Sequence, residues 1–114
     1  NMELKKKLFA EVREKMADFK KTPEYKTWLE TKIQDAVPFA SGDTVRIYLD
    51  PSDEEYRQEL EEKLSVSLIR SEIPFTGGMR AVIPEKNILI DNSFDSLISE
   101  EQETFIFHGG MTHE

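Results

Sequence analysis

Apolar residues recur at helical spacing along the first third of the chain and predict two consecutive helices. The first spans residues 2–21, and its apolar positions, three or four residues apart, are Leu4, Leu8, Val12, Met16 and Phe19. Thr22-Pro23 then starts the second helix, because proline fits a first helical turn and the threonine before it can cap the helix. The second helix ends by Pro38, and its apolar stripe consists of Tyr25, Trp28, Leu29, Ile33 and Ala36.

Apolar and polar residues alternate over residues 44–49, a pattern typical of a half-buried strand. One face of this strand carries Val45, Ile47 and Leu49, and the other carries Arg46 and Tyr48. After the strand, Ser52 and Glu55 have the S-x-x-E spacing of a capping box and predict a third helix. We interpret its charged positions, which begin with Asp53, as a solvated face. Its inward positions are Tyr56, Leu60 and Leu64.

Three more strands are predicted in the second half of the chain. Residues 66–69 form one of them, and residues 79–83 and 88–91 form a hairpin around the four-residue turn 84–87. Gly77-Gly78 precede the hairpin, where we expect a positive φ or a close approach of another backbone.

Asn92-Ser93 are expected to cap a final helix that stops at Gly109-Gly110. The buried positions of this helix are Leu97, Ile98, Phe105 and Ile106. The expected fold class is α+β: an N-terminal helix or helix pair, a strand–helix–three-strand domain with a four-stranded mixed sheet, and a C-terminal helix. The chain divides into an N-terminal helix (1–21), a globular domain (22–107) and a flexible tail (108–114).

The first helix admits two interpretations. Phe9, Val12, Met16 and Phe19 follow the 3-4-3 spacing of a coiled-coil seam. This stripe either packs on its own domain or belongs to a coiled coil that continues upstream, and two heptads do not decide between the two. Asn1-Met2 is typical of a tag remnant before a start methionine, so we expect the chain to come from a longer protein.

Composition narrows the classes of partner. The 114 residues include 15 basic and 23 acidic side chains, and the net charge of -8 argues against a nucleic-acid or anionic-lipid surface. The absence of cysteine excludes disulfides, thiolate catalysis and cysteine metal sites. No apolar run approaches the roughly 20 residues that a membrane span requires, so no direct membrane insertion is expected.

No group of residues has the pattern of an active site. His108 and His113 lie near the end of the chain, without the rigid element that a metal site needs. Asp91 is the one carboxylate in an apolar context, and we interpret it, with Asn92, as the end of a strand and the cap of a helix. Gly77-Gly78 lack the pattern of a phosphate-binding loop. We therefore expect no cofactor, no metal and no catalytic residue, which favours a structural or interaction role.

The stretch from Phe75 to Phe94 resembles the C-terminal domain of the E subunit of V-type and A-type ATPases. That family carries a double glycine, a β-hairpin and a strand that ends in Asp-Asn-Thr before a final helix. Here Gly77-Gly78 match the double glycine, and Asp91-Asn92-Ser93 match the strand end. Ser96-Leu97 stands where the family often has Arg-Leu.

The resemblance implies a four-stranded mixed sheet and a stator role without catalysis. In this family a long N-terminal helix pairs with the G subunit, called H in archaeal complexes, to form the peripheral stalk. The globular domain meets the N-terminal region of the A or B subunit of the head. The implied role is to couple ATP hydrolysis or synthesis to proton or sodium transport, in the cytoplasm, at the periphery of a membrane-bound complex. The residues then expected to face the partner helix are Leu8, Phe9, Val12, Met16 and Phe19.

Other functions stay open. A small ligand-binding or regulatory α+β domain would use a pocket walled by the hairpin and the helix that carries Trp28. An enzyme would need a cleft lined by Arg46, Tyr48 and Asp91, although the alternation places Arg46 and Tyr48 on the sheet face away from the core. For the head contact, the sequence leaves a sheet edge, the turn 84–87 and the final helix as alternatives.

Overall fold

The computed structural model describes residues 2–104 of the chain, and side chains from Lys6 to Glu100. Its helices are α1 (Met2–Lys20), α2 (Pro23–Ala36), α3 (Glu54–Leu64) and α4 (Phe94–Thr104). Its strands are β1 (Arg46–Leu49), β2 (Leu68–Arg70), β3 (Gly78–Ile83) and β4 (Ile88–Ser93). Short 3-10 helices follow α2, precede α3 and join the hairpin: η1 (Val37–Ala40), η2 (Pro51–Asp53) and η3 (Pro84–Lys86).

The four strands form one mixed sheet in the order β2-β1-β3-β4. β1 and β2 are parallel, because α3 carries the chain back between them, and the other two pairs are antiparallel. The predicted α+β class is therefore confirmed, with the hairpin β3–β4 on one side of the strand–helix–strand unit.

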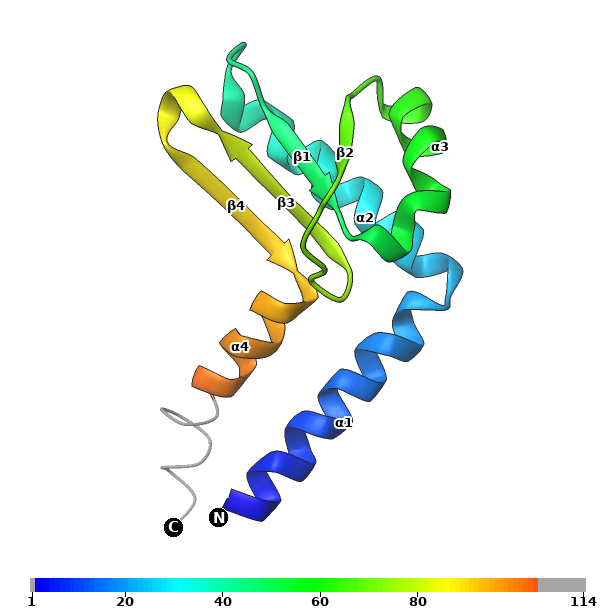
Figure 1. Cartoon of the computed structure of the whole chain (residues 1–114), viewed down its shortest axis with the longest axis vertical. Coiled ribbons are helices and arrows are strands. Elements are labelled where there is room, and N and C mark those ends of the chain that lie inside the picture. The colour runs from blue at the N-terminus through cyan, green and yellow to red at the C-terminus, as the bar shows by residue number, and fades with distance from the viewer. Residues whose placement is uncertain (1, 105–114) are drawn as a thin grey trace.

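Helices α2 and α3 cover one face of the sheet (Figure 1). Two ion pairs, Lys26–Glu59 and Lys63–Glu30, join the two helices along their length. The core lies between these helices and the sheet and contains most of the predicted apolar positions. Its buried members are Tyr25, Leu29, Ile33, Ala36, Ile47, Leu49, Leu60, Leu68, Met79, Ala81 and Phe94.

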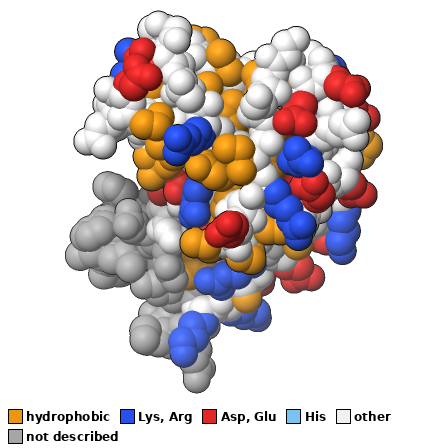
Figure 2. Space-filling view, turned by 45° about the horizontal axis from the view of Figure 1, so that its top comes forward, with side chains coloured by type: hydrophobic (Ala, Val, Ile, Leu, Met, Phe, Trp, Pro, Cys, Tyr) orange, Lys and Arg blue, Asp and Glu red, His pale blue; other side chains and the backbone are white. Residues whose placement is uncertain are grey.

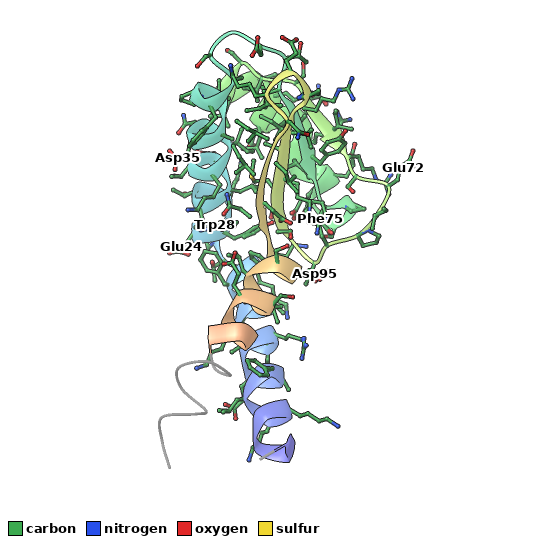
Figure 3. All side chains as sticks on the ribbon, turned by 90° about the vertical axis from the view of Figure 1, so that its left-hand side faces the viewer. Glu24, Trp28, Asp35, Glu72, Phe75 and Asp95 are labelled. Atoms are coloured by element: carbon green, nitrogen blue, oxygen red, sulfur yellow. The ribbon has the colours of Figure 1, made fainter. Side chains whose placement is uncertain are left out.

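No described element covers the opposite face of the sheet. Figure 3 shows the arrangement, with α2 and Trp28 on one side of the sheet and the loop that carries Glu72 on the other. Cross-strand pairing arranges the side chains of this face in two rows. We call this surface the open face; its rows are Ile69, Tyr48, Arg80 and Asp91, and Arg46, Val82 and Leu89. Arg46 and Tyr48 thus lie away from the core, as predicted.

Helices α1 and α4 run away from the sheet on the same side of the domain (Figure 1). They lengthen the molecule, whose principal extents are 49 × 31 × 23 Å. Within the described part of the chain, no helix is long and apolar enough to cross a membrane. The break between α1 and α2 falls at the predicted Thr22-Pro23. The Thr22 hydroxyl does not cap α2, however, but donates a 2.6 Å hydrogen bond to the Phe19 carbonyl and ends α1.

Other local predictions need correction. The expected Ser52–Glu55 capping box does not form, because η2 occupies residues 51–53 and the Ser52 hydroxyl donates to Asp50 instead. The helix α3 consequently begins at Glu54, one residue later than a cap at Ser52 would place it. At the start of α4 the predicted cap is confirmed, since the Ser93 hydroxyl oxygen accepts from the Ser96 N–H at 3.3 Å.

The predictions for Phe105, Ile106, His108, Gly109-Gly110, His113 and the tail 108–114 lie outside the described residues.

Candidate functional site

The two sequence motifs that carry the family resemblance are brought together at one end of the β3–β4 pair. Gly78 is paired with Ser93, and the Phe94 N–H donates to the Gly77 carbonyl at 2.9 Å. Gly78 has a φ of +81°, and a Cβ there would lie only 2.1 Å from the Asn92 carbonyl oxygen. We predicted a positive φ or a close backbone approach at the double glycine, and Gly78 has both.

Gly77 and Asp91 shape the same junction. A Cβ on Gly77 would lie 3.0 Å from the Phe94 ring, so the missing side chain makes room for that ring. The Asp91 carboxylate accepts from the Ser93 N–H at 2.9 Å and from the Ser96 hydroxyl at 2.6 Å. Burial pushes the pKa of Asp91 upward, but these hydrogen bonds outweigh it and the pKa is lowered. Asp91 therefore stays ionised and holds the start of α4. The interpretation of Asp91 and Asn92 as strand end and helix cap needs correction, because β4 continues to Ser93 and Ser93 provides the cap.

A buried polar network, which we call the joint, connects the helices to this junction. Its five residues are Lys20, Tyr25, Asp50, Asp53 and Gly78. The Tyr25 hydroxyl donates to the Asp53 carboxylate at 2.5 Å and accepts from the Gly78 N–H at 2.9 Å. One side chain of α2 thus binds both the entry to α3 and the first residue of β3, across 28 and 53 positions of sequence.

Asp50 and Lys20 extend the joint to α1 and to the loop before β3. One Asp50 oxygen accepts from the N–H groups of Phe75 and Thr76, at 2.7 and 3.0 Å. The Lys20 ammonium, from the last turn of α1, lies 3.6 Å from Asp53 and 3.9 Å from Asp50. The end of α1 is therefore fixed to the domain by charge as well as by packing.

The pKa values of the two carboxyl groups in the joint, Asp50 and Asp53, shift in opposite directions. Burial raises the pKa of Asp53, and the hydrogen bond from Tyr25 and the charge of Lys20 compensate only in part. Burial acts upward on the pKa of Asp50 too, but hydrogen bonds from Ser52 and Phe75 reverse the shift, and the pKa is lowered. Burial also raises the pKa of Tyr25, so its hydroxyl keeps its proton. The joint therefore works as a fixed structural network with Tyr25 as a permanent donor.

This arrangement corrects two predictions about carboxylates. The predicted place of Asp53 is the solvated face of α3, yet its residue surface is 1% exposed. The prediction that Asp91 is the one carboxylate in an apolar context is also wrong, because its side chain is 25% exposed and the buried carboxylates are Asp50 and Asp53. The available signal was the Asp50-Pro51 step directly after a buried strand, where an aspartate commonly binds backbone N–H groups of the following turn.

An apolar groove lies between α1, α2 and α4, next to the joint. Its hollow of about 280 Å³ is lined by Val12, Lys15, Met16, Phe19, Trp28, Phe94 and Leu97. The floor is an aromatic cluster, in which Tyr25 stacks on Trp28 with ring centroids 6.0 Å apart, and Phe19 meets both rings edge-on. Lys15 is the one charged side chain among the described residues that line the groove.

The five residues predicted to face a partner helix are distributed unequally. Val12, Met16 and Phe19 line the groove, and each keeps part of its surface exposed. Leu8 is half-buried on α1 outside the groove lining. Phe9 is only 3% exposed, so its ring has little surface left for another chain.

The described residues contain no group of three or more His, Cys, Asp or Glu side chains that could hold a metal ion. The hollow beside Tyr48 is lined by neither Arg46 nor Asp91.

Comparison of the chain with protein-family models, with curated proteins and with solved structures gave no match. The function is therefore inferred from the residues and their geometry.

Proposed function

We propose that this chain is part of a peripheral-stalk E subunit of a rotary V-type or A-type ATPase. The observation that carries the proposal is the groove, an apolar surface that the described residues leave open between α1 and α4, where such a protein would pair with its partner helix. The stretch from Gly77 to Ser93, which resembles the E-subunit family, also supports the proposal. Its matching residues form one structural unit, in which Gly78 approaches the Asn92 carbonyl.

The occupant of the groove in this proposal is a helix of the G or H subunit. Met16 and Phe19 from α1, with Leu97 from α4, offer an apolar strip of the kind that receives the apolar face of an amphipathic helix. Lys15 at the groove would favour an acidic residue on that helix. The helix pair formed by α1 and the partner would be the base of the stalk.

The joint supports the same role by its mechanics. A stator must transmit torque between the stalk and the head without bending. Lys20 ties α1 to two buried carboxylates, and Tyr25 ties α2 to the sheet and to the entry of α3. Buried and satisfied polar networks of this kind fix one arrangement of the elements they connect.

In the assembled complex the globular domain would contact the N-terminal region of the A or B subunit of the head. The protein would hold the head while the central shaft turns, so that ATP hydrolysis or synthesis is coupled to proton or sodium transport. It would act on the cytoplasmic side, at the periphery of the membrane-bound complex, without a cofactor of its own.

Co-expression with the G or H subunit from the same genome tests this proposal. We expect the two proteins to copurify, and Met16→Asp to abolish copurification because it places a carboxylate in the groove. Ala17→Asp is the matched control, since Ala17 is the next residue of α1 and is exposed. The proposal is wrong if the unmodified chain does not pair, or if Met16→Asp pairs as well as Ala17→Asp while its circular dichroism shows a folded protein.

One observation favours a second candidate, a small ligand-binding or regulatory domain. Trp28 and Phe94 line a hollow of about 280 Å³, close to the lower limit of small-molecule sites. A saturable change of Trp28 fluorescence on addition of an apolar small molecule would support this candidate. If the G or H subunit displaced that molecule, the result would support the groove as the binding site of the stalk partner.

A further inference from the structure

The open face of the sheet and the loop beside it carry exposed aliphatic side chains. Ile69 is 39% exposed and Leu89 is 62% exposed, on the two edge strands. Ile73, in the loop that borders the face, is 70% exposed. A hollow of about 370 Å³ lies between Tyr48, Ile69 and Ile73. Ile69 and Ile73 border this hollow, and Leu89 lies at the other edge of the same face. Exposed aliphatic groups rimmed by polar ones are typical of a protein-binding surface.

The charges of this face differ from those of the whole molecule. Its rows carry Arg46, Arg80 and Asp91, and Arg70 and Glu72 line the hollow beside them. Three arginines against two carboxylates make the face locally basic on a chain of net charge -8. Figure 2 shows basic side chains among the hydrophobic ones over the sheet. Arg46 is exposed and forms no ion pair with any residue that the structure describes.

Arg80 is held in place, unlike Arg46. Its guanidinium carbon lies 4.7 Å from the centre of the Phe75 ring, and its Nε lies 3.3 Å from an Asp91 oxygen. That Nε is buried, and among the described residues it has no hydrogen-bond partner of suitable geometry. A guanidinium already fixed on an aromatic ring loses little conformational freedom when it binds a carboxylate.

We propose that the open face binds a segment of another protein that presents Asp or Glu carboxylates beside aliphatic side chains. The carboxylates would pair with Arg80 and Arg46, and an aliphatic side chain would enter the hollow beside Tyr48. Nucleic acid and anionic lipid fit less well, because the molecule as a whole repels a polyanion. The inference rests on the proposed function only for the source of the segment, which would then be the head of the complex.

A random-peptide display library, selected on the whole chain, tests the partner chemistry without assuming a source. We expect the enriched peptides to combine Asp or Glu with Leu or Ile. In ¹⁵N NMR titrations of the chain, the most enriched peptide should shift the amide signals of Tyr48, Ile69, Arg80 and Leu89. Arg46→Gln and Leu89→Ser should each weaken binding about tenfold. Both residues are exposed, so these substitutions leave the fold intact.

Arg13→Gln is the matched control, because Arg13 is an exposed arginine on α1, outside the face. It should bind the peptide as the unmodified chain does. The inference is overturned if no peptide is enriched, if enriched peptides lack acidic residues, or if Arg46→Gln and Leu89→Ser bind like Arg13→Gln. The chain can also be tested on vesicles of phosphatidylserine and phosphatidylcholine. If it binds them, and if Arg46→Gln and Leu89→Ser both lose that binding, the inference is overturned in favour of a lipid surface. The stalk partner is absent from this experiment, so its failure leaves the copurification test of the groove untouched.

Discussion

Removing one oxygen atom from Tyr25 should show how much the joint contributes to the stability of this protein. Tyr25→Phe keeps the ring that stacks on Trp28 and meets Phe94 edge-on. It removes only the hydroxyl, which donates to Asp53 and accepts from the Gly78 N–H. The aromatic packing therefore stays constant while the Gly78 N–H loses its partner and Asp53 keeps only Lys20 among the described residues.

The expected cost follows from those two groups. A buried donor or acceptor without a partner costs about 1–3 kcal/mol, and hydrogen bonds to charged groups lie at the upper end of this range. The Asp53 carboxyl and the Gly78 N–H together give a loss of about 3 kcal/mol in the free energy of unfolding. For a domain of about 100 residues this corresponds to a drop of roughly 14 °C in Tm.

Urea unfolding and thermal circular dichroism measure the effect, with Tyr56→Phe as the control. Tyr56 is half-buried on α3, and its hydroxyl has no hydrogen bond to the described residues. Its substitution should change the free energy of unfolding by less than about 0.5 kcal/mol. If Tyr25→Phe costs no more than Tyr56→Phe, the joint does not hold the helices on the domain and the reasoning is refuted.

Two further predictions concern the same region. Gly78→Ala should destabilise the protein by several kcal/mol more than Gly42→Ala, because a Cβ on Gly78 would meet the Asn92 carbonyl whereas a Cβ on Gly42, also at positive φ, meets nothing within 4 Å. Thermal unfolding of both variants checks this, and equal losses would contradict it. Asp53→Asn should become more stable relative to the unmodified chain as the pH rises above 3.8, the ordinary value for this carboxyl. Since burial raises the pKa of Asp53 in the folded state, the folded protein binds the proton more tightly than the unfolded chain and loses stability as the pH passes from 3.8 up through the raised pKa. Urea unfolding of both proteins at several pH values from about 4 to about 7 tests the sign, and a constant difference would refute it.

Local patterns were enough to predict the order of the elements. The spacing of Leu29 and Ile33 placed the inner face of α2, and the alternation of Ile47 and Leu49 placed the inner face of β1; the structure buries all four. The position of Gly77-Gly78 alone predicts unusual backbone geometry there. Such signals survive in a single sequence because helix and strand periodicity and the freedom of glycine depend on neighbouring residues.

The joint and the open face were decided only by the tertiary structure. Asp53 belongs by sequence to a charged run, but the turn η2 directs it toward Tyr25, 28 positions away, and Gly78 then reaches the same hydroxyl from the other half of the chain. In the same way, Arg80 and Asp91 share a row with Tyr48 only because β3 pairs with both β1 and β4. A sequence pattern reports which residues lie on one face of one element. Which buried groups become partners depends on how separate elements pack, and that packing determined both the groove and the face that we propose as binding surfaces.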